Sequence, residues 1–205
     1  AAAYVAVDVH LMDNRDPFIY KTTDFGQTWT KISGGLPANH PLSYVKSVAE
    51  NPNRKGMLFA GTGRGFYYSI DDGGHWTQFK QGLPAAPVTW IVVEPRYHDV
   101  VVSTYGRGLY ILRDITRLEQ ADQGDQNTAV FMYAPRPGFR QARSGSTEFL
   151  YSLKSASADP VRIEILNASE SVIRTLQGPG KSGLSRATWD LRYEGPSQVE
   201  LRTTP

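Results

Sequence analysis

The stretch that decides the fold is Thr22-Thr23-Asp24-Phe25-Gly26-Gln27-Thr28-Trp29, because the chain repeats it. The second copy, Ser69-Ile70-Asp71-Asp72-Gly73-Gly74-His75-Trp76, lies 47 residues further on. At the same spacing Gly35-Leu36-Pro37 recurs as Gly82-Leu83-Pro84. A period of about 45 residues is typical of a propeller blade made of short strands.

A third unit follows the second. Gly63-Arg64-Gly65-Phe66-Tyr67 recurs 43 residues later as Gly106-Arg107-Gly108-Leu109-Tyr110. A helical solenoid of similar period would need long apolar patterns of period 3.6, and the sequence has none. We therefore predict an all-β chain that begins with about three four-stranded antiparallel blades of a β-propeller.

The breakers between apolar runs predict the strands of each unit. The predicted strands are 4–7, 18–22 and 29–32 in the first unit, 44–49, 57–60, 66–69 and 76–79 in the second, and 89–93, 100–103 and 109–112 in the third, with 129–133 available as a fourth strand. The first unit lacks an innermost strand. Closed propellers use about 4–8 blades, so we expect the remaining blades to come from the same chain or from a partner protein.

Chemically, the repeated signature is a device for a tight turn. Both copies have a hydroxyl residue, an aspartate, a glycine and a tryptophan at the same four positions. These are Thr22, Asp24, Gly26 and Trp29 in the first copy, and Ser69, Asp71, Gly73 and Trp76 in the second. The aspartate can accept backbone N–H groups, the glycine can take a positive φ, and the tryptophan can pack beneath the turn. A catalytic or metal-binding carboxylate is the alternative, but repetition in each unit favours a structural role.

The signature resembles the Asp box of bacterial neuraminidase (BNR) repeats. The segments 16–29, 58–62 and 103–110 are also similar to large exported bacterial proteins with sortilin-like BNR propellers, and the resemblance covers about residues 4–117. It implies an exported location in a bacterium and Asp boxes on the rim away from the ligand face. A glycosyl hydrolase label based on the repeat alone has little weight.

A second domain is expected after a linker rich in Pro, Gly, Ser and Arg. Alternating strands at 148–154, 161–165, 172–176 and 187–191 are typical of a half-buried sandwich. Their order is similar to the small Ig-like domain of the flagellar hook-capping type, although Ser169-Glu170 stands where that type has Asp-Gly. The predicted domains are propeller blades over 1–134, a linker over 135–146 and a truncated Ig-like β-sandwich over 147–205.

Composition excludes several function classes. The 22 Lys and Arg residues against 20 Asp and Glu give a net charge of +2, too balanced for a nucleic-acid-binding surface. No apolar run approaches the ~18 residues of a membrane span. The chain has no Cys, and its histidines (His10, His40, His75, His98) lack metal-ligand spacing, so we expect no disulfide, metal or cofactor.

Antiparallel strands place the ligand face opposite the Asp-box turns. The loops expected there carry Arg64, Arg107, Tyr105 and His40. The two arginines could bind a carboxylate, as in an acidic glycan or an acidic peptide. Alternatively, each arginine pairs with a carboxylate of a neighbouring blade, and its repetition favours this second interpretation.

These observations favour a non-catalytic protein- or glycan-binding or structural module, alternatively an accessory subunit of a larger assembly. The competing hypothesis is a glycoside hydrolase or sialidase-like enzyme with its catalytic acids in blades outside these residues. The carboxylates that could supply a glycosidase pair here are Glu94, Asp99, Glu50, Asp8 and Asp114. Sequence gives no distance between them, and that distance decides the chemistry.

Overall fold

The structure is a computed structural model that describes residues 2–122, 128–140 and 145–195. The chain divides into two compact units, unit 1 (Ala1–Ala121) and unit 2 (Asp122–Pro205). Apart from the single-turn helices η1 (His10–Met12) and α1 (Thr116–Glu119), the regular elements of the described ranges are antiparallel strands. The predicted all-β class is confirmed.

Three sheets form unit 1, each a meander in which consecutive strands pair. Sheet 1 contains β1 (Ala3–Ala6), β2 (Ile19–Thr22) and β3 (Thr30–Lys31). Sheet 2 contains β4 (Val45–Glu50), β5 (Leu58–Thr62), β6 (Gly65–Ser69) and β7 (Thr77–Phe79). Sheet 3 contains β8 (Val88–Glu94), β9 (Asp99–Thr104) and β10 (Gly108–Leu112). This succession is the arrangement of a propeller segment.

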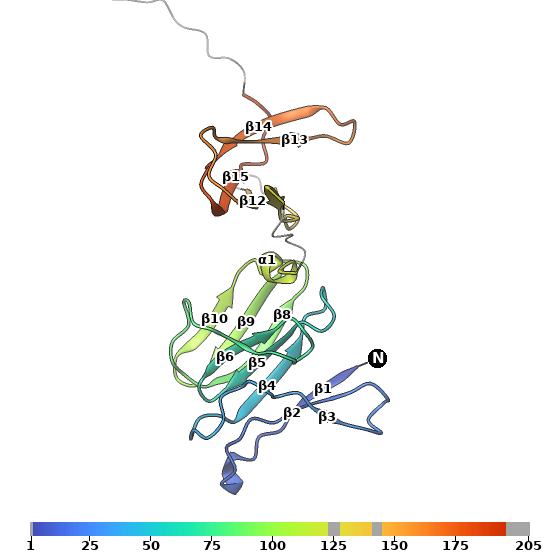
Figure 1. Cartoon of the computed structure of the whole chain (residues 1–205), viewed down its shortest axis with the longest axis vertical. Helices are drawn as coiled ribbons and strands as arrows, with labels where there is room; N and C mark the ends of the chain where they lie inside the picture. Colours follow the sequence, from blue (N-terminus) through green and yellow to red (C-terminus); the bar gives the residue numbers. More distant parts are fainter. Residues whose placement is uncertain (1, 123–127, 141–144, 196–205) are drawn as a thin grey trace, which may run out of the picture. The chain divides into compact units, whose positions relative to one another are not determined.

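The three sheets follow one another in chain order (Figure 1). We call the side of a sheet that points to the next sheet its forward face, and the other side its back face. Ile19 of sheet 1 meets Ala60, Tyr67 and Trp76 of sheet 2 in one buried core. A second core joins sheets 2 and 3 through Phe59, Phe66, Ile91, Val100 and Val102. Burial of these apolar faces against one another is what holds the sheets together.

Strand register places repeated residues on matching faces. Tyr20 lies opposite Val5, Tyr67 opposite Ala60, and Tyr110 opposite Val102. Because side chains alternate across a strand, these tyrosines point to the back face and their neighbours Ile19, Phe66 and Leu109 point to the forward face. Residues that are equivalent in the sequence repeat therefore point to the same face of their respective sheets.

Sheet 3 differs from the expected blade. Asp114 leads into helix α1 rather than into a hairpin, and β11 (Val130–Met132) pairs with β12 (Thr147–Leu153) of unit 2. The segment 129–133, which the sequence left available as a fourth strand of the third blade, instead contributes β11 to the sheet of β12. The division between the two units at Ala121/Asp122 differs from the predicted boundary after residue 134, because β11 finds its hydrogen-bond partners in the second unit.

Helix α1 is fastened to the sheets by polar contacts. Arg54 donates from Nη1 to the carbonyls of Leu118 and Glu119, each at 2.9 Å. The Glu119 carboxylate accepts from Asn51 Nδ2 at 2.8 Å and lies 2.6 Å from His98 Nδ1. These contacts provide hydrogen-bond partners for the carbonyls of Leu118 and Glu119 and for the Glu119 carboxylate at the end of unit 1.

Unit 2 is a small β-sandwich. One sheet contains β11, β12 and β15 (Gly183–Trp189), and the other contains β13 (Val161–Leu166) and β14 (Val172–Gly178). Its core is made of Phe149, Tyr151, Leu153, Ile163 and Ala187. Trp189 packs against this core. This agrees with the alternation of apolar and polar residues from which the strand 187–191 was predicted. Gly178 lies where a Cβ would come within 2.4 Å of the Tyr151 hydroxyl, so the close approach of β14 requires glycine.

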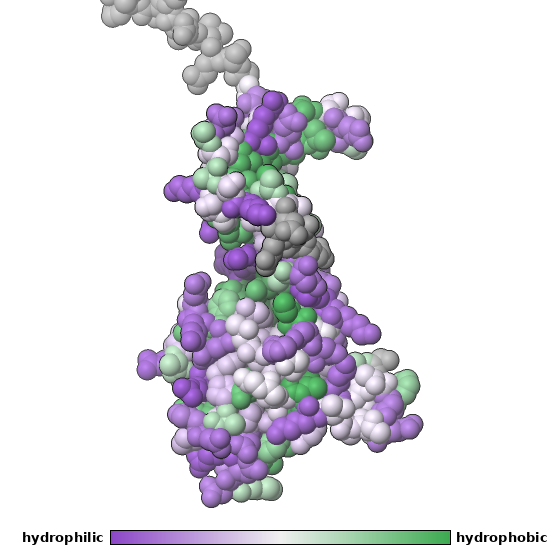
Figure 2. Space-filling model, in the orientation of Figure 1, coloured by the Kyte–Doolittle hydropathy of each residue, from purple (hydrophilic) through white to green (hydrophobic). Residues whose placement is uncertain are grey.

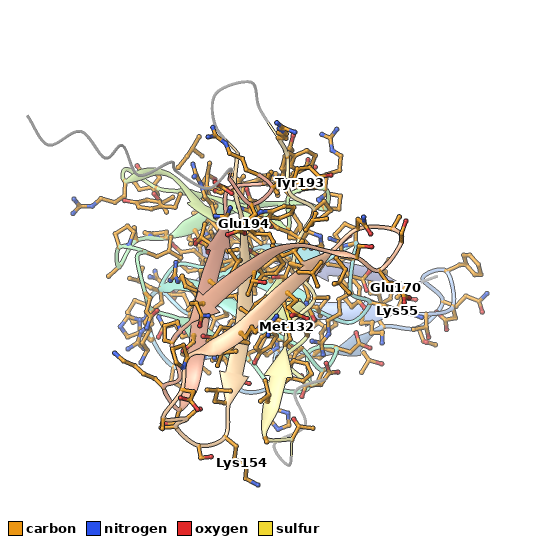
Figure 3. All side chains as sticks on the ribbon, turned by 90° about the horizontal axis from the view of Figure 1, so that it is seen from above. Lys55, Met132, Lys154, Glu170, Tyr193 and Glu194 are labelled. Carbon is orange, nitrogen blue, oxygen red and sulfur yellow. The ribbon has the colours of Figure 1, made fainter. Side chains whose placement is uncertain are left out.

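In the view of Figure 2, hydrophilic side chains cover much of unit 1, with hydrophobic patches between them. Figure 3 shows the side chains of unit 2, with Glu170 in the turn between β13 and β14 and Met132 on β11. Within the described ranges, no helix has the length and apolar character that crossing a membrane requires.

Candidate functional site

The sheets of unit 1 have two ends with different loops. The turns β5–β6 and β9–β10, the long β1–β2 loop and the connections between sheets lie at one end, which we call the loop face. The turns β2–β3 and β6–β7 and the connections β4–β5 and β8–β9 lie at the other end, the hairpin face. Strand direction alone fixes this separation.

At the hairpin face, the two repeated signatures make the same set of hydrogen bonds. Asp24 Oδ1 accepts from the Thr28 N–H at 2.9 Å and from the Thr22 hydroxyl at 2.8 Å, while Thr22 Oγ1 accepts from the Gly26 N–H at 2.9 Å. In the second copy, Asp71 Oδ1 accepts from the His75 N–H and the Ser69 hydroxyl, each at 2.8 Å, and Ser69 Oγ accepts from the Gly73 N–H at 2.9 Å.

The second carboxylate oxygen is also held within its own turn. Thr28 Oγ1 donates to Asp24 Oδ2 at 2.6 Å, and in the second copy His75 Nδ1 lies 2.5 Å from Asp71 Oδ2. Hydrogen bonds from the Thr28 side chain and N–H lower the pKa of Asp24 to about 2, and those from His75 lower the pKa of Asp71 to about 2. Carboxylates that are this strongly stabilised as anions are poor proton donors and bases near neutral pH.

The two tryptophans of the signatures have different environments. Trp76 is 9% exposed and its indole N–H donates to the Ile32 carbonyl of sheet 1 at 2.8 Å. Trp29 is 44% exposed, and its N–H donates to Gly26 of its own turn at 3.1 Å. The expectation that both pack beneath their turns therefore describes Trp76, whereas Trp29 lies at the back face of sheet 1, which no described sheet covers.

At the loop face, hydrogen bonds fix the two arginine-bearing turns. Thr62 Oγ1 accepts from the Arg64 N–H at 3.0 Å and donates to the Gly65 carbonyl. In sheet 3, Thr104 Oγ1 donates to the Gly108 carbonyl at 2.8 Å, across the turn that carries Arg107. Each arginine thus extends from a turn whose backbone is held in place.

The same turns are tied to the strand that begins the sheet. The Gly63 N–H donates to the Tyr44 carbonyl at 3.0 Å, and the Tyr105 N–H donates to the Pro87 carbonyl at 2.8 Å. A Cβ on Gly63 would come within 2.7 Å of the Tyr44 ring. In sheet 3 the residue that makes this hydrogen bond is Tyr105, and its side chain is 77% exposed.

Arg64 and Arg107 are both exposed. Among the residues that the structure describes, neither arginine side chain forms an ion pair. The expectation that each would pair with a neighbouring blade's carboxylate is thus not met in this part of the chain. His40 is also exposed, but its Nδ1 accepts the Leu42 N–H at 3.1 Å, which uses one ring nitrogen to shape the connection between sheets 1 and 2.

A further cluster on the loop face was not predicted as a group. Asp8 lies 2.5 Å from His10 Nδ1 and accepts from Lys46 Nζ at 3.0 Å, and the His10 ring stacks on Tyr44 at 4.5 Å between centroids. Burial raises the pKa of Asp8, but the bonds from His10 and Lys46 outweigh it and the net shift is downward. The long β1–β2 loop brings these residues together, and this loop has no counterpart in the other units that could have signalled the cluster.

The other carboxylates considered for a glycosidase pair lie at the hairpin face. Glu50 accepts from the Gly56 N–H at 3.0 Å, Glu94 from Arg96 Nε at 2.9 Å, and Asp99 from the Asp114 N–H at 2.9 Å. Asp8 is the member of that group on the loop face. At the loop face, Asp8 is therefore the single member of this group among the described residues, whereas Glu94 and Asp99 lie opposite each other in the β8–β9 pairing at the hairpin face.

A polar clasp closes the hairpin side of the junction between sheets 1 and 2. The Tyr4 hydroxyl donates to Asp72 Oδ1 at 2.8 Å, and Lys21 Nζ contacts the other oxygen of Asp72. Burial and the neighbouring carboxylates of Asp72 and Glu50 raise the pKa of Tyr4, so the hydroxyl stays protonated and donates. Over the described ranges, no three His, Asp or Glu side chains gather as a metal site.

Comparisons with known proteins add little to this picture. No protein-family model matches the chain, and no curated protein matches its sequence. Among solved structures, an ancestral GH74 enzyme matches with a TM-score of 0.40 and 16% sequence identity, over 88% of this chain. The matched part is 17% of the length of that enzyme. The description of the fold therefore depends on the strand pairing and packing of this chain itself.

Proposed function

We propose that the chain is a non-catalytic binding and structural module, a propeller segment of BNR type whose loop face binds carboxylate groups of an acidic glycan or an acidic peptide. The observation that carries the proposal is the exposure of Arg64 and Arg107, without an ion pair among the described residues, on repeated turns that are held by hydrogen bonds. A guanidinium that has no protein partner can form a bidentate contact with a carboxylate.

The surroundings of the arginines support this choice. Tyr105 presents an exposed ring in the same turn as Arg107, and aromatic rings of this kind contribute contact area to recognition of sugars and peptides. Most acids of unit 1 lie at the hairpin face. Of those in the β1–β2 loop at the loop face, Asp8 is paired with Lys46 and Asp13 with Arg15, while Asp16 is exposed. The loop face is thus suited to an anionic ligand.

Two parts of the proposal depend on the sequence resemblance. The signatures at 22–29 and 69–76 support an assignment to the Asp-box repeats, and the resemblance to exported bacterial proteins supports a location outside the cytoplasm. The order of strands in unit 2 supports an Ig-like type. Fractionation of the producing cells tests the location, and recovery of the chain in the cytoplasm would contradict it.

The binding proposal is tested by calorimetric titration of the full chain with an oligogalacturonate and with a hexaglutamate peptide at low salt. Loss of one charged hydrogen-bonding group costs about 1.5 kcal/mol or more, so Arg64→Ala and Arg107→Ala should each weaken binding about tenfold. Arg96→Ala is the matched control, because this exposed arginine lies at the hairpin face. No binding of either probe, or equal losses in the control, would refute the ligand face.

The non-catalytic part has its own test. Incubation of the chain with a panel of polysaccharides should release no reducing ends. Turnover that disappears on substitution of a single carboxylate, such as Asp8→Asn, would show an enzyme instead.

A further inference from the structure

His10 is a titratable side chain on the loop face, in the long β1–β2 loop. It begins helix η1, and its side chain is 26% exposed. Its ring stacks on the Tyr44 ring at 4.5 Å between centroids. One ring nitrogen, Nδ1, lies 2.5 Å from Asp8 Oδ1. The other nitrogen, Nε2, forms no hydrogen bond with the residues that the structure describes.

Tyr44 links His10 to the turn that carries Arg64. The Gly63 N–H donates to the Tyr44 carbonyl at 3.0 Å, and a Cβ on Gly63 would come within 2.7 Å of the Tyr44 ring. His10 and the β5–β6 turn therefore contact the same residue, although they belong to different sheets. Charges this close can act on one ligand, because screening in 0.1 M salt develops over about 10 Å.

The contact with Asp8 determines which ring nitrogen of His10 carries the proton. Burial raises the pKa of Asp8, but the bonds from His10 and Lys46 outweigh it and the net shift is downward, so Asp8 is a carboxylate near neutral pH. An ionised carboxylate can only accept hydrogen bonds. Nδ1 of the neutral His10 ring therefore holds the proton, and Nε2 presents a lone pair.

Protonation of His10 reverses the character of Nε2. A charged imidazole donates from both nitrogens, so Nε2 changes from an acceptor, which repels a carboxylate oxygen, to a charged donor, which binds one. The other ionisable groups that face the ring are Asp8 from its own loop and Tyr44 and Lys46 from β4. Side chains of these three types ordinarily titrate outside the range between pH 5 and 8, in which histidine changes its charge.

We propose that His10 is a third anion-binding group of the loop face, which binds a ligand carboxylate when it is protonated, so that binding strengthens as the pH falls from about 8 to about 5.5. This role rests on the proposed function, since it concerns the same ligand. Asp8 and Lys46 pair and cancel in charge, so protonated His10 adds one positive charge near the turn of Arg64. Ligand carboxyl groups stay ionised over this range, because they ordinarily titrate near pH 4.

The test is calorimetric titration of the full chain with the oligogalacturonate and the hexaglutamate peptide, at the same low salt, between about pH 8 and about pH 5.5. One added charge-assisted hydrogen bond corresponds to about a tenfold change in Kd, so the Kd should be about tenfold lower at the acidic end. In His10→Gln the ratio of the two Kd values should shrink to about one. His75→Gln is the matched control, because His75 Nδ1 also lies 2.5 Å from an aspartate oxygen but at the hairpin face, and it should keep the full ratio.

The possible failures are distinguishable. A Kd that does not change with pH, while Arg64→Ala still weakens binding, would overturn the role of His10 and leave the proposed function intact. Loss of the pH dependence in His40→Gln rather than in His10→Gln would overturn it too, because the responding group would then lie in the connection between sheets 1 and 2. No binding of either probe at any pH would overturn the proposed function and the role of His10 together.

Nitrogen NMR of the full chain with labelled histidine tests the same role without a variant, in case His10→Gln folds poorly by circular dichroism. At about pH 8, the neutral His10 ring should carry its proton on Nδ1, as the contact with Asp8 requires. A proton on Nε2 would overturn the proposal, because Nε2 would then already be a donor before His10 gains its charge.

Discussion

Removal of the buried tryptophan should damage unit 1 far more than removal of its exposed repeat partner. Trp76→Ala takes away a side chain that fills the core between sheets 1 and 2 and leaves the Ile32 carbonyl without its indole donor. Truncation of a buried tryptophan costs about 3–5 kcal/mol. Trp29→Ala removes a side chain that is about half exposed and bonded within its own turn, so we expect about 1–2 kcal/mol.

The assay is urea unfolding of the full chain followed by far-ultraviolet circular dichroism, at concentrations where the chain is monomeric. With a urea slope of about 2 kcal/mol/M, a loss of about 4 kcal/mol lowers the midpoint of the unit 1 transition by about 2 M. The transition of unit 2, which contains neither residue, should not move. Equal shifts for the two variants would refute the reasoning, because they would mean that sheet 1 does not cover Trp76.

Two further expectations concern the hairpin turns. Gly73→Ala places a Cβ within 3 Å of Ile32 at a positive φ, so it should lower the free energy of unfolding by more than Gly26→Ala. At Gly26 the φ is of the same kind, but the nearest atom to a Cβ would be in the Trp29 ring at 3.8 Å, an ordinary contact, and urea titration compares the two variants. Asp24 and Asp71 should titrate near pH 2 in carboxyl NMR spectra. Because both pKa values lie below those of the unfolded chain, the turns stabilise unit 1 fully above about pH 4 and lose this contribution as the pH falls toward 2; inflections near pH 4 would contradict the bonding.

Much of unit 1 could be predicted because its sequence repeats. The pairing of Tyr67 with the β5 strand follows from breakers at Asn51-Pro52-Asn53 and at Gly63, and the strands 44–49 and 57–60 lie within about two residues of β4 and β5. Local turn chemistry and alternation determine such elements. The repeat also shows from the sequence alone that Trp29 and Trp76 are equivalent residues.

Other features depend on contacts that a local pattern does not contain. Val130–Met132 has strand character, but its alternation does not say which sheet it joins, and β12 supplied the partner. Trp29 belongs to the same motif as Trp76, but a tryptophan at this position is buried only where another sheet packs on the back face of its own sheet. Sheet 1 does so for Trp76. The Asp8–His10–Lys46 cluster needs the β1–β2 loop to turn back onto β4, and residues 38 positions apart give no local signal for this.

The packing of sheet 1 on sheet 2 is tested most directly by nuclear Overhauser spectra of the tryptophan indole N–H groups. The Trp76 indole N–H should show cross-peaks to Ile32 and exchange slowly with solvent, while the Trp29 indole N–H should show cross-peaks only within its own turn. A rapidly exchanging Trp76 indole N–H without a cross-peak to Ile32 would contradict the stacked-sheet architecture.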